Sequence, residues 1–352
     1  MNARWIACLL ALIAAPALAQ GFGGLGTTAE GFAVPKRGEK LVFPRDHGQH
    51  PDHRIEWWYV TANLVGPDGT AYGAQWTLFR SALSPEVGSG WSSPQLYMAH
   101  AAVTTKDRQF VAERRARGGT GQADVTLAPF TAAIDDWTLT SRASAGQDEY
   151  AALTATARGE DFAFELALDA RGPLVEHGER GYSVKSQSGQ ASYYYSQPFY
   201  QVSGTLDLPS GEVVVTGNAW LDREWSSQPL ADNQTGWDWL SLHFEGGAKL
   251  MGFQLRQHGG DAFTSATWID PDGTPQAMQP GDLVLKPLDI SQVGERMVPT
   301  QWRVLLPKKG VDVTIDALNP QAWMATSVPY WEGPVTVKGS SSGVGYLEMT
   351  GY

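Results

Sequence analysis

Short runs that alternate apolar with polar residues recur along almost the whole chain, and turn-forming residues separate them. Such runs occupy residues 56–64, 70–81, 150–158, 199–208, 238–244 and 249–256, and Pro, Asp, Ser and Gly fill turns at 67–69, 209–211, 246–247 and 271–273. Alternation with a period of two is typical of half-buried β-strands, and these turn residues favour hairpins. No run has the periodicity of an amphipathic helix of three turns. The pattern therefore predicts an all-β sandwich or barrel.

The N-terminus has the layout of a secretory signal peptide. Arg4 precedes an apolar run over residues 6–18, and Ala17-Leu18-Ala19 forms a small-x-small cleavage site. The apolar run is shorter than the ~20 residues that a membrane-spanning helix needs, which disfavours the alternative of a retained anchor. We expect residues 1–19 to be removed near Ala19 and the mature protein to be periplasmic or secreted.

Charge and cysteine content exclude several classes of function. The chain has 37 acidic and 26 basic residues, a net charge of −11. This balance argues against nucleic-acid binding, which depends on basic contacts to phosphate, and against electrostatic docking to anionic lipid. The single cysteine, Cys8, lies inside the expected signal peptide. The mature chain therefore has no disulfide, no thiolate nucleophile and no cysteine-ligated metal.

The length of the expected mature chain, 333 residues, predicts two domains, since a common domain size is ~150 residues. The stretch 172–195 is the best boundary, because its residues 178–192 are rich in Gly, Ser, Gln and charge and have little periodicity. We expect a flexible N-terminal arm at 20–40, a first domain at 41–192 and a second domain at 193–352.

The first candidate cluster surrounds the strand expected at 56–64. Glu56 has the parity of the apolar residues of that strand and should lie at the end of a buried face. Partial burial would raise its pKa and suit it to general-acid catalysis. The alternative is a structural ion pair with Arg45, Arg54 or Arg223.

Three histidines at a spacing of three, His47, His50 and His53, precede this strand. With Asp46 or Asp52 they could ligate a metal, but Gly48 and Pro51 break any helix that would align the rings. We favour a hydrogen-bonded Asp–His loop packed on Trp57, and we expect neither a metal nor a cofactor.

The second candidate cluster is the strand that contains residues 219–228. Asp222 and Glu224 should share one face, with Arg223 and Trp225 on the other. Two carboxyl groups in an apolar pocket titrate apart, so that one keeps its proton near neutral pH. This arrangement suits acid–base addition of water. The alternative is a salt-bridge network of Arg223 and the acids that links the two barrels.

The third candidate cluster is the strand at 236–244. Leu240, Leu242 and Phe244 should form one face, and Trp237, Trp239, Ser241 and His243 the other. Tryptophan side chains beside acids can wall a pocket for a long apolar ligand, although each ring alone could equally fill a core. No serine stands in a nucleophile elbow and no dinucleotide fingerprint follows a strand.

Several motifs along the chain, in order, resemble those of the family of AttH and the carotenoid 1,2-hydratases. They are Phe-Pro-Arg-Asp-His-Gly (43–48), Glu-Trp-Trp-Tyr (56–59), Tyr-Tyr-Tyr-Ser (193–196), Asp-Arg-Glu-Trp-Ser (222–226), Gly-Trp-Asp-Trp (236–239), Tyr-Trp-Glu-Gly (330–333) and Gly-Tyr-Leu-Glu-Met-Thr-Gly-Tyr (345–352). The resemblance implies two lipocalin-like, calycin-type antiparallel β-barrel domains. Members are often labelled secreted hydrolases, and those similar to AttH tend to be encoded beside ABC-transporter permeases.

The hydratase branch of the family adds water across a terminal double bond of an acyclic carotenoid. In that branch a His follows the Asp where this chain has Arg223, and a Tyr and an Asp on the next strand have no counterpart at residues 249–253. An arginine stays charged in proteins and cannot deliver a proton. The resemblance therefore carries over only to Asp222 and Trp225.

These observations predict a secreted protein that binds a long hydrophobic, lipid- or isoprenoid-like ligand and hydrates or hydrolyses it. The expected catalytic residues are Asp222, Glu224, Glu56 and His47. The expected ligand-binding residues are Trp57, Trp58, Tyr59, Tyr195, Arg223, Trp225, Trp237, Asp238 and Trp239. The alternatives are a non-catalytic lipid carrier or an accessory of an ABC-transporter permease, and, more weakly, a carbohydrate-binding surface.

Overall fold

The computed structural model describes residues 29–352 except 87, 229 and 232. The expected signal peptide, residues 1–19, lies outside the described residues. The described chain is all-β, with short 3₁₀ helices at Arg45–His47, Gly90–Ser92, Glu149–Ala151 and Pro307–Lys309. None of its helices is long and apolar enough to cross a membrane.

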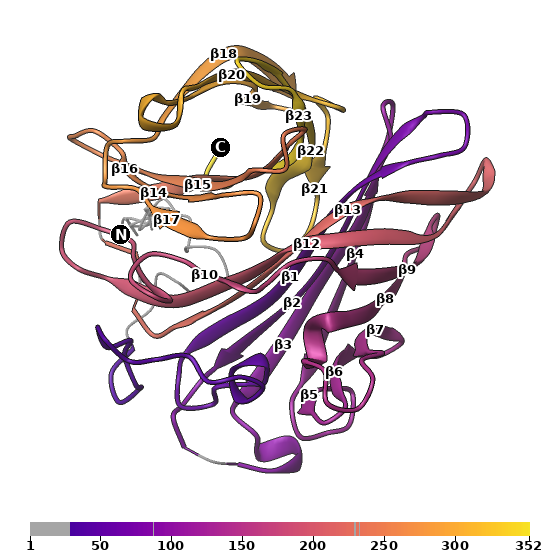
Figure 1. The fold of residues 1–352 in the computed structure, drawn as a ribbon. Helices are drawn as coiled ribbons and strands as arrows, with labels where there is room; N and C mark the ends of the chain where they lie inside the picture. Colours follow the sequence, from indigo (N-terminus) through magenta and orange to yellow (C-terminus); the bar gives the residue numbers. More distant parts are fainter. Residues whose placement is uncertain (1–28, 87, 229, 232) are drawn as a thin grey trace, which may run out of the picture.

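The first sheet is antiparallel, has thirteen strands and is built on the order β4-β3-β2-β1-β13-β12-β9-β8-β7-β6-β5, with β10 and β11 paired to β12 (Figure 1). Its strands are β1 Ile55–Val65, β2 Ala71–Ala82, β3 Gln95–Thr104, β4 Gln109–Arg117, β5 Ala123–Leu127, β6 Phe130–Ile134, β7 Trp137–Ser141, β8 Ala152–Arg158, β9 Ala163–Ala170, β10 Val175–Glu176, β11 Tyr182–Val184, β12 Ala191–Leu208 and β13 Gly211–Ser226.

The second sheet is antiparallel, has ten strands and follows the order β17-β16-β15-β14-β23-β22-β20-β19-β18, with β21 paired to β22. Its strands are β14 Gln234–Phe244, β15 Lys249–Gln257, β16 Phe263–Ile269, β17 Pro275–Ala277, β18 Val284–Val293, β19 Arg296–Leu306, β20 Val311–Ala317, β21 Trp323–Met324, β22 Tyr330–Gly339 and β23 Gly343–Met349. The two sheets curl into a nearly closed barrel and a half-barrel, which confirms the expected all-β, lipocalin-like class.

Each run expected to be a strand lies within or across an observed strand, and the expected turns join neighbouring strands. Residues 67–69 connect β1 to β2, 209–211 include the junction of β12 and β13, and 246–247 lie between β14 and β15. Gly69 and Gly247 have φ values of 84° and 87°. Glycine reaches such values without the clash that a Cβ would cause.

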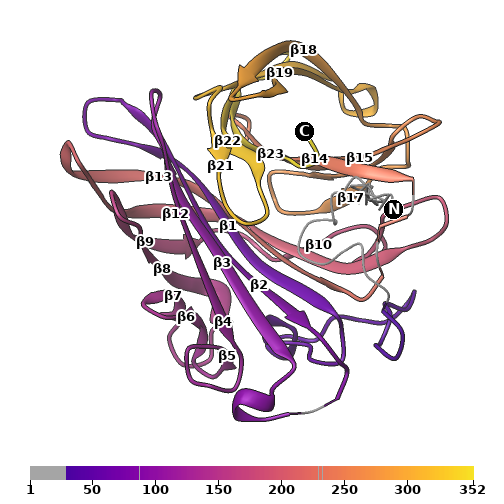
Figure 2. The ribbon, with the colours of Figure 1, turned by 180° about the vertical axis from the view of Figure 1, so that it is seen from behind.

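The division between the two sheets lies between Ser226 and Gln234, later than the expected boundary at 192/193. The polar stretch 178–192 is not a linker, because β11 and the hairpin after it fold back on β12 in the first sheet. The long strands β12 and β13 then extend the first sheet toward the second one (Figure 2). The polar composition of residues 178–192 therefore corresponds to the hairpin between β11 and β12, and the change from one sheet to the other comes later.

The part of the expected flexible arm that the structure describes, residues 29–40, is attached to the first sheet. The amide of Lys36 donates to the Tyr193 hydroxyl at 2.8 Å, and the amide of Ala33 donates to the Asp52 carbonyl at 2.9 Å. Residues 29–40 form no strand, which explains their low periodicity, yet these hydrogen bonds still attach them to the first sheet.

Four hydrophobic clusters hold the described part of the chain together, and the smallest consists of Ala102, Met324 and Tyr330. One fills the first barrel, around Trp58, Trp76 and Trp137, and a second fills the other barrel, around Leu240 and Trp331. The third joins the barrels and contains Tyr59, Tyr194, Trp220, Trp239, Met251, Phe253, Leu255, Phe263 and Tyr346 among others. Its members come from strands of both sheets, so the contact between the barrels is itself a core.

The pairing of β1 with β13 requires a glycine at position 217. A Cβ there would lie 2.0 Å from the Asn63 carbonyl oxygen, which belongs to the paired strand. We expect Gly217→Ala to lower the free energy of unfolding by about 1–3 kcal/mol, the usual cost of overpacking. Urea denaturation measures this change. Gly246→Ala is the control, because its Cβ would meet nothing within 4 Å, and an equal loss in both variants would contradict the expectation.

Candidate functional site

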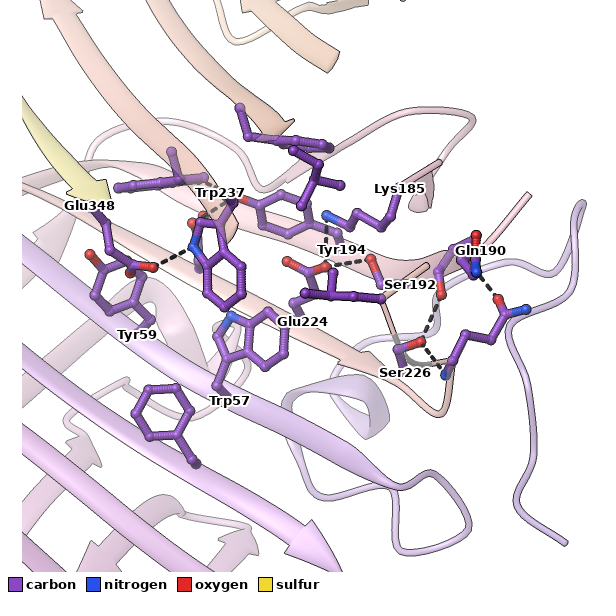
Figure 3. A pocket seen from close by; sticks show the side chains of 18 of the residues that line it. Trp57, Tyr59, Lys185, Gln190, Ser192, Tyr194, Glu224, Ser226, Trp237 and Glu348 are labelled. Carbon is purple, nitrogen blue, oxygen red and sulfur yellow. Dashed lines mark hydrogen bonds and ion pairs between the residues drawn. The ribbon is translucent and has the colours of Figure 1, made fainter. Parts of the chain in front are cut away.

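A pocket lies at the contact between the two barrels. The space between its walls is about 890 Å³, which includes open solvent. The walls come from β1, β2, β12, β13, β14, β15, β23 and the segments that follow β11 and β13. Figure 3 shows Trp57, Tyr59, Trp237 and Glu348 gathered at one end and Lys185, Gln190, Ser192 and Ser226 at the other. One end of the pocket is thus aromatic and acidic, and the other is polar.

Strand alternation decides which side chains reach the pocket. On β13, Asp222 and Glu224 line it, and Arg223 and Trp225 point to the opposite side, into the first barrel. This confirms the two faces expected for residues 222–225. The same alternation places Trp57 of β1 in the pocket wall.

Asp222 is a buried carboxyl group that accepts hydrogen bonds from several donors. Its Oδ1 accepts from Trp220 Nε1 at 2.6 Å and from the Ser196 hydroxyl, and its Oδ2 accepts from the Tyr194 hydroxyl at 2.6 Å. Burial raises the pKa of Asp222 to about 7, against the lowering effect of these donors. The group therefore exchanges a proton near neutral pH.

Glu348 of β23 supplies a second carboxyl group of similar acidity. Its Oε1 accepts from Trp237 Nε1 at 2.6 Å (Figure 3). Burial raises the pKa of Glu348 to about 7, opposed by hydrogen bonds with Trp237 and Tyr59 and reinforced by the charges of Asp222 and Glu224. The charge of Asp222 is thus one of the causes that raise the pKa of Glu348.

Glu224, expected to be catalytic, is held in an ion pair. Its Oε1 lies 2.8 Å from Lys185 Nζ and accepts from the Ser192 hydroxyl. The ammonium of Lys185 also lies over the rings of Tyr194 and Phe253, at 4.7 and 4.3 Å from their centroids. Glu224 thus forms the polar end of the pocket together with Lys185.

The raised pKa expected for Glu56 is wrong. Arg80 Nε donates to one of its carboxylate oxygens and Arg223 donates to the other, and the amide of His50 adds a bond of 2.8 Å. Although burial alone would raise it, the two guanidinium groups hold the pKa of Glu56 well below its usual range. The Glu56 carboxylate does not line the pocket. It forms a structural ion pair with Arg223, which was the alternative interpretation of this residue.

His47 is also remote from the pocket. Its Nδ1 lies 2.7 Å from the Tyr195 hydroxyl, its Nε2 lies 3.0 Å from Asp148, and its ring stacks on Tyr150. The segment before β1 is the hydrogen-bonded Asp–His loop that we favoured, because His50 Nε2 lies 3.4 Å from Asp46 Oδ1. The ring of His50 stacks on Trp225, with 4.0 Å between the ring centroids, whereas we expected the loop to pack on Trp57. Within residues 29–352, gaps excluded, no group of acids and histidines is arranged to hold a metal ion.

The other expected ligand-binding residues divide by strand parity. Tyr59, Trp237 and Trp239 line the pocket. Four buried residues do not: Trp58, Tyr195, Trp225 and Asp238. Asp238 pairs instead with Arg256, and Arg223 Cζ lies 3.9 Å from the centroid of the Trp58 ring. Neighbours in one motif therefore have different environments.

Sequence reasoning missed the residues that complete the pocket: Lys185, Ser192, Tyr194, Phe253, Leu255 and Glu348. The sequence did contain a signal for Glu348, because this residue is the only acid of the motif 345–352, which is part of the family resemblance. No sequence pattern brings residue 348 to residue 222. Pairing of β14 with β23 places Glu348 opposite Trp239, and the contact between the two sheets places both of them in one pocket with Asp222.

The fold and the pocket define a class: two-barrel, lipocalin-like proteins with a buried acidic pocket between the barrels. Comparison with known proteins then gives the family, because residues 34–352 match the AttH-like family. A crystal structure of a protein assigned as an AttH from Nitrosomonas europaea is 34% identical, with a TM-score of 0.82, over 91% of this chain and 99% of that one. The chain belongs to the AttH-like family.

More distant solved structures share the fold. Kievitone hydratase from Nectria haematococca is 13% identical with a TM-score of 0.67, over 92% of this chain and 96% of that one. CghA with Sch210972 is 13% identical with a TM-score of 0.54, over 94% and 97%. The search of curated proteins finds no significant match.

Proposed function

We propose that this protein binds an elongated hydrophobic ligand between its barrels and either adds water across a double bond of that ligand or removes water from an alcohol of the ligand to form a double bond. The observation that carries this proposal is the pair of carboxyl groups, Asp222 and Glu348, that face one aromatic pocket with pKa values of about 7. Acid–base catalysis is most effective when the pKa of the group lies near the working pH.

The two carboxyl groups have different roles in this reaction. Asp222 accepts three hydrogen bonds, which favour its carboxylate form, whereas Glu348 has fewer donors, Trp237 Nε1 at 2.6 Å and the Tyr59 hydroxyl. Glu348 gives its proton to one carbon of the double bond. A water molecule attacks the other carbon, and Asp222 accepts the proton that this water loses.

The aromatic walls suit the charge that develops in such a step. Protonation of an alkene leaves positive charge on carbon, and the faces of tryptophan and tyrosine attract a cation. Trp57, Tyr59 and Trp237 lie at the same end of the pocket as Glu348 (Figure 3). The distant likeness to kievitone hydratase agrees with water addition but carries only the fold.

Mass spectrometry of organic extracts tests this proposal. The mature protein is incubated with total lipid and isoprenoid extract, and products that differ from a component by the mass of one water are sought. Such a product that disappears when Glu348→Gln replaces the wild type supports a hydratase or dehydratase. Absence of any such product across the extract contradicts it.

A non-catalytic lipid carrier is the second candidate. It is favoured by the complete set of donors around Asp222, because a carboxyl group that is fully hydrogen-bonded can serve structure alone. A ligand that co-purifies with the protein and is recovered unchanged would support the carrier. The polar end of the pocket, with Lys185 and Glu224, would then hold its head group.

Export and an envelope partner belong to the same proposal. The signal sequence at residues 1–19 supports a periplasmic or secreted protein, and the family resemblance supports an ABC-transporter permease as partner. We expect the protein purified from its native envelope to begin at Gln20. N-terminal sequencing checks this, and a chain that retains Arg4 would contradict it.

A further inference from the structure

Lys185 and Glu224 form an ion pair in the pocket wall that has no part in the proposed acid–base steps. Lys185 Nζ lies 2.8 Å from Glu224 Oε1, and the Ser192 hydroxyl donates to the same oxygen. The side chains of Lys185 and Glu224 are only 20% and 7% exposed. The pair is therefore largely shielded from bulk solvent and faces the interior of the pocket (Figure 3).

Both sheets hold Lys185 in place. Its amide donates to the Gln190 carbonyl at 2.6 Å, within the hairpin between β11 and β12. Its carbonyl accepts from Gln234 Nε2, at the start of β14, at 3.0 Å. Its ammonium group lies over the faces of Tyr194 and Phe253, which attract a cation. The charge of Lys185 is thus positioned without any contribution from a ligand.

The ion pair keeps hydrogen-bonding capacity for a ligand. An ammonium group has three N–H donors, and within the described residues Lys185 Nζ has one oxygen partner, Glu224 Oε1. Glu224 Oε2 accepts no hydrogen bond from the part of the chain that the structure describes, yet it is not sealed inside the protein. Since Glu224 lines the pocket, this oxygen faces its open space. A donor and an acceptor therefore lie side by side in the pocket wall.

The other side-chain oxygens at this end are already bonded to the protein. The Ser226 hydroxyl donates to the Ala191 carbonyl at 2.7 Å, and the Ala191 amide donates to Gln228 Oε1 at 2.8 Å. Gln190 Oε1 accepts from the Ser186 hydroxyl. The acceptor that this end offers to a ligand is therefore Glu224 Oε2.

The charges of the ion pair favour an uncharged partner. One ammonium and one carboxylate group together have no net charge. An anionic head group would be attracted by Lys185 but repelled by Glu224, and a cationic head group would meet the reverse. Such repulsion is strong where solvent is largely excluded. A hydroxyl group meets no repulsion, because it accepts from Lys185 and donates to Glu224.

From this geometry we infer that the polar end of the pocket binds an uncharged hydroxyl group, so that the ligand is a long-chain alcohol or phenol and not a fatty acid, a phosphate ester or an amine. The inference rests on the proposed function, which places a hydrophobic ligand in this pocket. Asp222 and Glu224 are two residues apart on β13, a separation of about 7 Å along a strand. The bound hydroxyl group therefore sets the distance of the double bond from its own end of the ligand.

Binding of matched ten-carbon probes tests this inference. 1-Decanol, decanoate and 1-methoxydecane are titrated at about pH 7.5 against the fluorescence of the pocket tryptophans, Trp57, Trp237 and Trp239. We expect 1-decanol to bind at least about tenfold more tightly than either analogue, because hydrogen bonds to charged groups contribute about that factor or more. Decanoate is repelled by Glu224, and 1-methoxydecane cannot donate to it. Equal or tighter binding of either analogue, or no binding of 1-decanol, overturns the inference.

Single changes of charge provide an independent gain of binding. Glu224→Gln leaves the charge of Lys185 uncompensated, so decanoate should bind at least about tenfold more tightly than to the wild type. Lys185→Met leaves the charge of Glu224 uncompensated and should favour decylammonium to a similar extent. Glu176→Gln also replaces a carboxyl group by an amide, but outside the pocket, and should keep the wild-type preference. A folded variant that shows no gain for its probe overturns the inference.

These measurements need no turnover, so they fail separately from the proposed reaction. If the preference for 1-decanol and both gains are observed but the extract screen yields no product shifted by one water, the reaction is refuted and the hydroxyl site stands. If a product forms but the preference is absent, the hydroxyl site is refuted and the reaction stands.

Discussion

Glu348→Gln is expected to lower kcat for water addition by about 10²–10⁴, the range that a general acid contributes. The amide matches the carboxyl group in size and accepts the bond from Trp237, but it has no acidic proton. Asp222→Asn is expected to cause a similar loss, because an amide cannot accept the proton of the attacking water. Rates are measured with the substrate that the extract screen identifies, and KM should change little in either variant.

Glu176→Gln is the control for these variants. Burial raises the pKa of Glu176 as well, but its side chain does not line the pocket. It should retain wild-type turnover. If Glu348→Gln keeps its kcat, Glu348 is not the acid, and if Glu176→Gln loses as much, the effect is one of stability.

Glu56→Gln is expected to cause the largest loss of stability, about 3–5 kcal/mol, because it leaves two buried guanidinium groups without their counter-charge. Arg80 and Arg223 are both fully buried and both bond to this carboxylate. Urea unfolding near pH 7 measures the loss. A variant as stable as the wild type would show that the ion cluster is not what holds the entry of β1.

The same carboxylate makes stability depend on pH. The pKa of Glu56 is depressed in the folded protein, so its contribution is present above the pKa of the unfolded chain and is lost as the pH falls below it. The wild type should therefore lose stability below about pH 4.5 more steeply than Glu56→Gln. Asp312→Asn is the control, since its exposed pair with Arg303 should change neither value appreciably.

Local patterns predicted the strands and their faces well. Alternation of two residues is enforced by the backbone itself, so the parities of Asp222 and Glu224 could be assigned without knowing the fold. Parity does not say what each face meets. Both faces of β13 are buried over residues 219–226, one in the first barrel and one against the second. The odd positions Arg223 and Trp225 were therefore assigned to ligand binding although they pack in a core.

Long-range pairing explains what the sequence did not reveal. The residues next to Glu56 in the sequence would also fit a buried general acid. Only the pairing of β1 with β2 and β13 brings Arg80 and Arg223 to its carboxylate. Glu348 stands more than one hundred residues from Asp222 and reaches the pocket through the second barrel. Contacts between barrels follow from tertiary docking, which no local periodicity encodes.

Infrared titration of the buried carboxyl groups tests the central claim most directly. The carboxylic-acid C=O absorbance of the wild type is recorded from pH 5 to pH 9, and the spectra of Asp222→Asn and Glu348→Gln assign the bands. We expect both bands to titrate with midpoints near pH 7. Bands already absent at pH 5.5 would mean that both groups are ordinary carboxylates with pKa values near 4, and would contradict an acid–base pocket.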